Sequence, residues 1–262
     1  MNSYDRVLIA RDPNRITGKG LIDKLLTEKV EFHGDRLFGE DSAIYAGIGM
    51  LNDKKVTFIA NDKGTNIEER MENNFGMAHP EGYRKVIRLA KQAEKFNRPI
   101  ITVIDTAGAY PGIGAEERGQ GSAIAQCLYE LSDLKVPIIS ILLSEGGSGG
   151  ALAIGVCDHM LMFENAFYSV ISPEGYASIL YKDGSKAPEI VDDMKIMPKD
   201  LLKMQIIEEI IKEPKKGLTL ENFEYHRHEL KKRLCDVIDQ KQSLKPEKLI
   251  KERYNRFRKF GK

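Results

Sequence analysis

The chain has 262 residues, of which 42% are hydrophobic and 30% charged, the balance of a folded globular protein. Its 40 Lys and Arg against 39 Asp and Glu leave a net charge of +1, which argues against a chain-wide electrostatic grip on nucleic acid or an acidic membrane surface. Three cysteines without a Cys-x-x-Cys pair exclude a disulfide framework and a self-contained zinc ribbon. With neither an apolar run long enough for a membrane span nor a signal-peptide core, the expected location is the cytoplasm.

The predicted elements of the first half alternate between strands and helices. Residues 43–51 and 56–60 predict a β-hairpin that turns at Asn52-Asp53. Residues 80–96 have the apolar periodicity of an amphipathic helix, and an apolar strand over residues 99–105 follows it.

The same alternation continues with a helix over residues 116–134, a strand over 137–143 and a short helix over 151–156. Continuous apolar strands separated by helices are typical of a buried parallel sheet with crossover helices. We therefore expect one α/β domain over residues 1–211.

The C-terminal part, residues 212–262, has a different composition. It holds 16 Lys and Arg against 8 Asp and Glu, so the first 211 residues carry a net charge of −7. Two helices are predicted, over residues 218–240 and 245–260, broken near Pro246. We interpret this segment as a basic helical tail that packs on the body or on a partner chain, with nucleic-acid binding as the alternative.

Glycine is concentrated after the two apolar strands. Ten of the 23 glycines lie between Asp105 and Gly155, and they cluster at residues 108–114 and 146–150. In open parallel sheets ligands bind at the carboxyl ends of the strands, and the unpaired N–H groups of a following helix can hold an anion or a reaction oxyanion. Tight strand–helix packing is the alternative explanation.

Three common motifs compete for this region. Gly146-Gly-Ser148-Gly-Gly150 satisfies the nucleophile elbow of a serine hydrolase, but His159 is too close in sequence, and His226 and His228 lie in the basic tail. Asp105-Thr-Ala-Gly resembles a GTPase motif, yet the chain has no phosphate-binding loop. The glycine spacing also fits a dinucleotide-binding fold poorly.

Longer runs carry a more specific resemblance, which extends from about Ala10 to Glu213. The chain resembles the alpha subunit of bacterial acetyl-CoA carboxylase carboxyltransferase in four runs: Asp105-Thr-Ala-Gly-Ala-Tyr-Pro-Gly-Ile-Gly-Ala-Glu-Glu-Arg-Gly-Gln120, Ser144-Glu-Gly-Gly-Ser-Gly-Gly-Ala-Leu-Ala-Ile-Gly155, Tyr168-Ser-Val-Ile-Ser-Pro-Glu-Gly175, and Asn74-Phe-Gly-Met77 with Pro80-Glu-Gly-Tyr-Arg-Lys85. The resemblance implies an α/β fold of the crotonase/ClpP type, a spiral of ββα units, here with a C-terminal helical extension.

The resemblance also implies an activity and partners. Such a subunit transfers the carboxyl group of carboxybiotin, held on the biotin carboxyl carrier protein, to acetyl-CoA, and the malonyl-CoA formed begins fatty-acid synthesis. It is active only with a beta subunit, which bears the zinc, in a heterotetramer of two alpha and two beta chains. ATP binding belongs to the complete complex, and this chain is expected to hold no metal and no covalent cofactor.

The family places the catalytic oxyanion donors at the backbone N–H groups of Gly149 and Gly150. The expected substrate- and biotin-binding residues are shared between the two loops: Ala109, Tyr110, Pro111, Gly112, Gly146, Gly147, Ser148 and Ala151. The family mechanism needs no side-chain base, because biotin that has released carbon dioxide can itself take the substrate proton. For Tyr110, simple packing is the alternative.

Some neighbouring residues keep more than one interpretation. Glu116, Glu117 and Arg118 are candidates to orient the loop, to pair across a subunit interface or to cap the next helix. Ser172-Pro-Glu-Gly175 has the pattern of a capped helix start. His33 is interpreted as structural.

The sequence also departs from the family pattern. A longer N-terminal helical segment is expected in the family, and His-Gln-Lys-Gly is replaced by Asn61-Asp-Lys-Gly64. Residues 68–73 are acidic where basic residues are usual, and Ala107 replaces a proline. A divergent paralogue, acting on another acyl-CoA or without activity, therefore stays open as an alternative.

Overall fold

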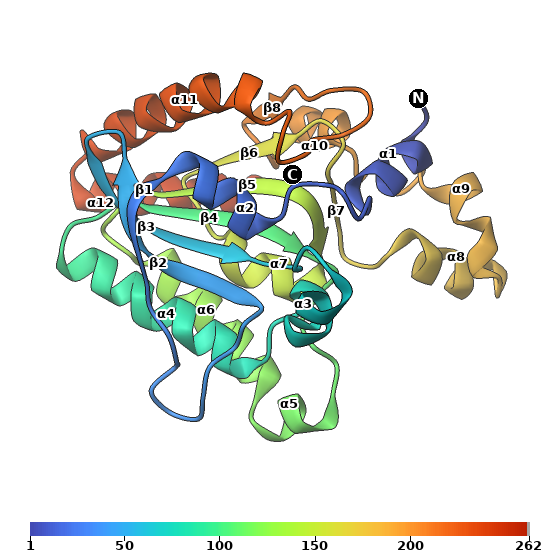
Figure 1. The fold of residues 1–262 in the computed structure, drawn as a ribbon, viewed down its shortest axis with the longest axis horizontal. Helices are drawn as coiled ribbons and strands as arrows, with labels where there is room; N and C mark the ends of the chain where they lie inside the picture. The colour runs from blue at the N-terminus through green and yellow to red at the C-terminus, as the bar shows by residue number, and fades with distance from the viewer. Residues whose placement is uncertain (261–262) are drawn as a thin grey trace.

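A mixed eight-stranded sheet forms the centre of the computed structural model, which describes residues 1–260, so the tail's last two residues, Gly261 and Lys262, lie outside the described part (Figure 1). The strand order is β1-β2-β3-β4-β5-β6-β8, with β7 paired to β5. The strands are β1 (Thr27–Glu31), β2 (Ile44–Leu51), β3 (Lys54–Asn61), β4 (Ile100–Thr106), β5 (Ile138–Gly147), β6 (His159–Phe163), β7 (Phe167–Ser169) and β8 (Glu209–Ile211). β1, β2 and β3 pair antiparallel, and every pairing from β3 to β8 is parallel.

Helices cover both faces of this sheet (Figure 1). The α-helices are α1 (Ser3–Ala10), α2 (Gly18–Leu25), α3 (Ile67–Glu72), α4 (Pro80–Lys95), α5 (Ile113–Glu117), α6 (Gln120–Ser132), α7 (Ser148–Gly155), α8 (Pro173–Tyr181), α9 (Ala187–Ile190), α10 (Pro198–Lys203), α11 (Glu224–Gln242) and α12 (Pro246–Arg258). α4, α6 and α7 pack together on one side, and α2 and α11 contact each other on the other. Every residue of β4 and β5 is therefore buried, which explains their unbroken apolar runs.

An arm projects from this body. α8 and α9 extend to one side, next to the N-terminal helix α1 (Figure 1). The apolar side chains Val7, Phe167 and Val191 form a small core between α1 and the arm.

No helix within residues 1–260 has the length and apolar character needed to cross a bilayer.

The hairpin, the first amphipathic helix and the strand after it are confirmed. β2 and β3 pair with Leu51 opposite Lys54 across the predicted turn, and Asn52 has the positive φ of 54° that such a turn requires. α4 and β4 match the predicted ranges to within one residue at each end.

Three predicted boundaries are wrong. The single helix over residues 116–134 is instead α5 and α6, separated at Gly119, whose φ of +83° no continuous helix contains. β5 continues through Gly147, and α7 already begins at Ser148. α11 begins at Glu224, because Thr219 and Asn222 exchange side chain–backbone hydrogen bonds of 2.8 and 3.2 Å that close a turn ahead of it.

The basic tail contacts the body through a buried ion pair. Arg253, 1% exposed, donates to both carboxylate oxygens of Asp158 at 2.9 and 2.7 Å. Its guanidinium also donates to the backbone carbonyls of Leu131, Leu134 and Val136 at 3.0, 2.7 and 2.9 Å. α12 is thereby fixed to the turn between α6 and β5.

Candidate active site

Two glycine-containing segments meet at the carboxyl ends of β4 and β5, which we call loop 107–112 and turn 147–150. A Cβ built on Gly147 would lie 1.9 Å from the carbonyl oxygen of Ala107, and one built on Gly150 would lie 2.4 Å from the carbonyl carbon of Gly108. Any side chain at these two positions would push the segments apart. The structure thus brings together the two clusters that sequence analysis singled out.

Turn 147–150 presents backbone N–H groups at the start of α7. The first N–H groups of a helix have no partner within it, and no side chain caps this helix. Gly149 is half-exposed and Gly150 is buried against loop 107–112. A partly open helix start of this kind can stabilise an oxyanion.

Ser148 is exposed at this turn and has a positive φ of 48°. This is the sharp strand-to-helix turn of a nucleophile elbow. Within residues 1–260, however, no hydrogen bond joins Ser148 to a histidine, and His159 pairs with Glu209 at 2.7 Å. Among the described residues, no histidine is therefore placed to act as a base for Ser148.

Loop 107–112 is fixed from behind. The Thr106 hydroxyl accepts from the N–H of Gly108 at 3.1 Å and donates to its carbonyl at 2.7 Å. The N–H of Tyr110 donates to the carbonyl of Ala78 at 3.0 Å, so this N–H is not free for a substrate. The Tyr110 ring stacks on His79 with a centroid separation of 4.2 Å.

The remaining predicted site residues divide by burial. Pro111 is exposed and Ala109 and Gly112 are half-exposed, with Gly112 against the Tyr110 ring. Gly146 is buried against Leu142 and Tyr168, and Ala151 is fully buried in α7. Gly146 and Ala151 therefore form the wall beneath the turn.

A charge network lies at the same strand ends and was not predicted. Lys63 pairs with Asp105 at 2.7 Å and with Glu145 at 3.6 Å, and Arg11 pairs with Glu145 at 2.7 Å and with Glu174 at 3.0 Å. Burial raises the pKa of Glu145, but the hydrogen bond from Arg11 and the charges of Lys63 and Arg11 outweigh burial, and its pKa is lowered. Glu145 is thus an ionised anchor two residues before the turn.

The acidic and basic residues after the loop also have defined places. Arg118 donates to both carboxylate oxygens of Glu81 at 2.8 and 3.1 Å, so it pairs within the chain. Glu116 and Glu117 are exposed. The capped helix start is confirmed, because Ser172 accepts from the N–H of Gly175 at 3.0 Å.

The replacements in the family pattern can be located as well. Ala107 is exposed at the tip of the site, and Lys63 belongs to the charge network. On α3, Glu68, Glu69 and Glu72 are all exposed, and Glu69 also accepts hydrogen bonds from the backbone N–H and the hydroxyl of Thr65.

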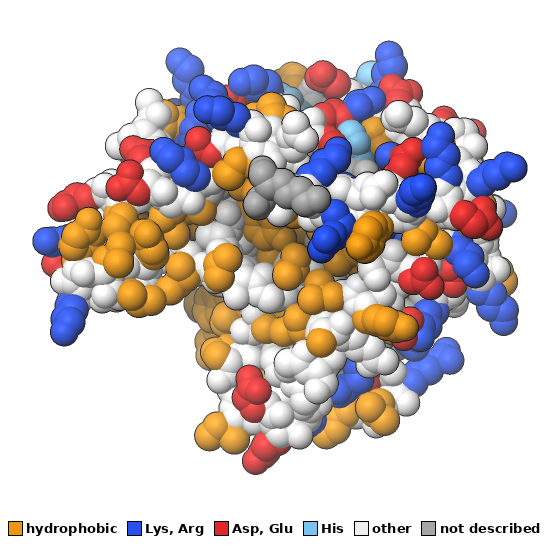
Figure 2. Space-filling model, turned by 180° about the vertical axis from the view of Figure 1, so that it is seen from behind, with side chains coloured by type: hydrophobic (Ala, Val, Ile, Leu, Met, Phe, Trp, Pro, Cys, Tyr) orange, Lys and Arg blue, Asp and Glu red, His pale blue; other side chains and the backbone are white. Residues whose placement is uncertain are grey.

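Exposed apolar side chains accompany the site and the arm. Ile113 and Leu152, on the helices that follow the two segments, are 80% and 39% exposed. Figure 2 shows apolar side chains gathered over the arm, where Ile179 and Leu180 on α8 are more than half exposed, as is Val170 just before α8. Within residues 1–260, no group of three or more His, Cys, Asp or Glu side chains is arranged to hold a metal ion.

Comparison with known proteins places the whole chain in one group. The family model described as acetyl co-enzyme A carboxylase carboxyltransferase-like matches residues 1–261. The chain is 53% identical over 258 residues to the acetyl-coenzyme A carboxylase carboxyl transferase subunit alpha of Clostridium botulinum (strain Eklund 17B), covering 98% of this chain and 94% of the relative. It is also 53% identical to the subunit of the same name from Streptococcus uberis, covering 96% of each chain.

Only 6% and 4% of the length of these two relatives is unmatched, so they too have no room for the longer N-terminal helical segment expected in the family.

Solved structures resemble the fold at low identity. Transcarboxylase 12S, determined with methylmalonyl-coenzyme A bound, matches 89% of this chain with a TM-score of 0.66 and 20% identity. The beta subunit of geranyl-CoA carboxylase from P. aeruginosa matches 93% with a TM-score of 0.65 and 13% identity. This chain spans 44% and 43% of those two chains, respectively. The predicted α/β fold of the crotonase type is confirmed.

Proposed function

Because this chain belongs to the family of acetyl-CoA carboxylase carboxyltransferase alpha subunits, we propose that it transfers a carboxyl group from carboxybiotin to acetyl-CoA. The product is malonyl-CoA, the starting unit for fatty-acid synthesis. The observation that carries the proposal is the close approach of loop 107–112 to the uncapped start of α7.

The proposed reaction develops negative charge on oxygen atoms that the site must stabilise. The N–CO₂ bond of carboxybiotin breaks, the ureido nitrogen takes a proton from the acetyl methyl group, and the resulting enolate forms a C–C bond to carbon dioxide. Negative charge develops on the thioester oxygen and on the ureido oxygen. Aimed backbone N–H groups stabilise such oxyanions, and loss of one donor costs roughly 10²–10³ in rate in other enzymes.

The residues of this chain supply a fixed frame for that chemistry. We assign the oxyanion donors to Gly149 and Gly150, and the binding surface to the exposed parts of loop 107–112 and turn 147–150, with Gly146 and Ala151 beneath them. Ser148 acts as part of the turn, since it has no base beside it.

A beta subunit is the expected partner, because the relatives are named alpha subunits. The exposed apolar side chains of the arm and of Ile113 and Leu152 are suited to a subunit contact. Two alpha and two beta chains, zinc on the beta subunit, biotin presented by its carrier protein and a cytoplasmic location complete the proposal.

Co-purification with the beta subunit followed by an assay of carboxyl exchange from malonyl-CoA to biotin tests this function. Exchange by the complex and none by the isolated chain is the expected result. A fully assembled complex without exchange would refute the assignment. Preference for a longer acyl-CoA in competition would instead identify a paralogue with another substrate.

A further inference from the structure

We propose that Gln120 is a positioning residue that holds loop 107–112 in its working place, an inference that rests on the proposed function. Gln120 is the first residue of α6 and is only 3% exposed. Its side chain is buried and contacts loop 107–112 from beneath, at the backbone carbonyl of Tyr110.

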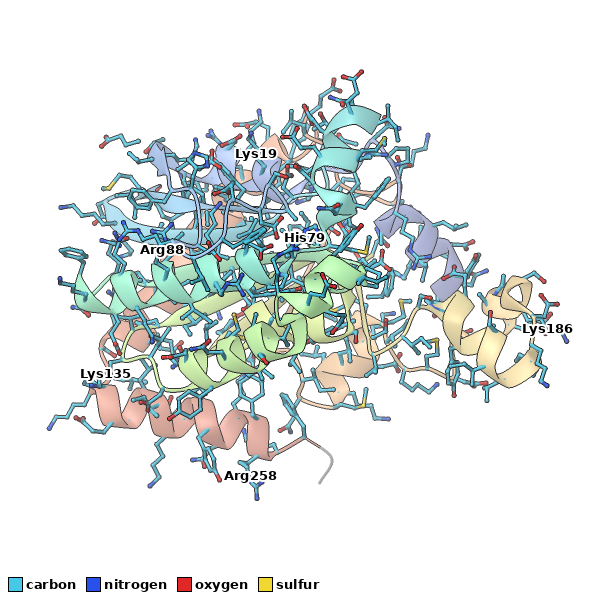
Figure 3. All side chains as sticks on the ribbon, turned by 90° about the horizontal axis from the view of Figure 1, so that it is seen from below. Lys19, His79, Arg88, Lys135, Lys186 and Arg258 are labelled. Carbon is cyan, nitrogen blue, oxygen red and sulfur yellow. The ribbon has the colours of Figure 1, made fainter. Side chains whose placement is uncertain are left out.

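The amide of Gln120 connects the loop to the body. Its Nε2 donates to the carbonyl of Tyr110 and to the carbonyl of Ala78, each at 2.9 Å. Ala78 is also the acceptor for the Tyr110 N–H. Ala78 is fully buried, and the next residue, His79 (labelled in Figure 3), donates its backbone N–H to Asp41 at 2.7 Å, so Ala78 belongs to a segment fixed by the body. One amide thus ties the loop to a fixed support.

The two carbonyl acceptors dictate the chemistry of this position. Both N–H bonds of the amide are used, and among the described residues Oε1 is buried without a donor. A buried oxygen without a hydrogen-bond partner is unfavourable, so the two hydrogen bonds donated by the NH₂ group must hold this side chain in place. A glutamate carboxylate has the same shape but no N–H group, so its oxygen would face the carbonyl oxygens of Tyr110 and Ala78 without donating a hydrogen bond to either.

The backbone around Gln120 is fixed independently of its side chain. Gly119 adopts the left-handed conformation that separates α5 from α6. The pair between Arg118 and Glu81 holds the end of α5 to α4. A change confined to the Gln120 amide therefore removes one support of the loop, at the carbonyl of Tyr110, and leaves the turn at Gly119 in place.

A displacement of loop 107–112 would be passed to turn 147–150 by the contact at Gly150. A Cβ built on Gly150 would lie 2.6 Å from the Ala109 nitrogen, so the loop and the turn are in direct backbone contact. Movement at Tyr110 therefore changes the spacing between loop and turn. Displacements of about 1 Å in a catalytic site reduce turnover by roughly 10²-fold.

The decisive variant is Gln120→Glu, assayed in the complex with the beta subunit. We expect kcat for carboxyl exchange to fall by roughly 10–100-fold while KM for malonyl-CoA stays within about threefold, because the loop is displaced and not removed. Activity should recover partly at low pH, where the introduced carboxyl group becomes protonated and again offers one donor. Gln126→Glu, an exposed position on the same helix, is the matched control and should change neither constant.

A second measurement keeps this inference separate from the proposed function. Hydrogen–deuterium exchange of the peptide containing residues 105–114 should be faster in Gln120→Glu than in wild type and unchanged in Gln126→Glu. If wild-type complex lacks carboxyl exchange, the proposed function fails, and deuterium exchange still decides the role of Gln120. Unchanged kcat or unchanged deuterium exchange in Gln120→Glu overturns the inference.

If Gln120→Glu does not fold, Gln120→Asn decides, because it keeps the NH₂ group on a shorter stem. Faster deuterium exchange in loop 107–112 of this variant would support the inference, and exchange equal to that of wild type would overturn it.

Discussion

The contact between loop 107–112 and turn 147–150 predicts opposite outcomes for two neighbouring glycines. In Gly150→Ala the new methyl group would lie 2.4 Å from the carbonyl carbon of Gly108 and 2.6 Å from the nitrogen of Ala109. Carbon atoms prefer about 3.5 Å, so the loop must withdraw by about 1 Å. In Gly149→Ala the nearest atom is Ile124 Cδ1 at 3.6 Å, an ordinary contact.

The magnitudes follow from this difference. Overpacking against backbone costs about 1–3 kcal/mol of stability, and a displacement of about 1 Å at the site costs roughly 10²-fold in rate. Gly150→Ala should therefore lose about two orders of magnitude in carboxyl exchange. Gly149→Ala keeps its N–H and should stay within about threefold of wild type, because its methyl group makes only an ordinary contact.

Both variants are compared by carboxyl exchange in the assembled complex and by chemical denaturation of the isolated chain. Co-purification with the beta subunit checks that assembly is intact. Equal activities for the two variants would refute the argument from backbone contact, whichever level they share.

Three further outcomes are expected. Ser148→Ala should keep carboxyl exchange within about threefold, since the hydroxyl has no base; fluorophosphonate labelling of wild-type Ser148 with loss of activity in the variant would contradict this. Arg253→Met should lower the free energy of unfolding by about 3–5 kcal/mol in urea titrations by stranding the buried Asp158 carboxylate, and adding Asp158→Asn should restore part of it. Burial raises the pKa of Asp35, but the Arg84 hydrogen bond and three backbone N–H groups outweigh it and lower that pKa from 3.8 to about 2. Its stabilising contribution is therefore complete above about pH 4 and lost as pH falls through about 2, so Asp35→Asn should flatten the acid side of a stability–pH curve, whereas an unchanged curve would refute it.

Local patterns predicted the parts of the fold that depend on local periodicity. β4 and α4 were predicted nearly to the residue, because apolar runs and amphipathic stripes report burial directly. The meeting of the two glycine clusters also followed, since parallel strands end at one edge of a sheet. The break at Gly119 did not follow, because a single glycine within a helical pattern is compatible with a continuous helix.

The polar contacts of the site depend on distant parts of the chain. Arg11 and Glu145 are 134 residues apart, and nothing near either residue identifies the other as its partner. Gln120 is the last residue of a run that sequence analysis had singled out, but its role depends on the backbone carbonyls of Ala78 and Tyr110. Every residue has a backbone carbonyl, so residue types cannot show which carbonyl accepts a hydrogen bond. Because the predicted helix began at residue 116, the place of Gln120 at the start of α6 was not foreseen either.

The ion pair between Arg253 and Asp158 can form only late in the synthesis of the chain. Asp158 precedes Arg253 by 95 residues, so the ribosome adds the acidic partner long before the basic one. Until α12 is made, the body holds a carboxylate and a set of backbone carbonyls at a site that excludes water once folded. The tail therefore supplies the last-synthesised side chain of the body's buried interior. A chain shortened before Arg253 would leave the Asp158 carboxylate and these carbonyls without their guanidinium partner.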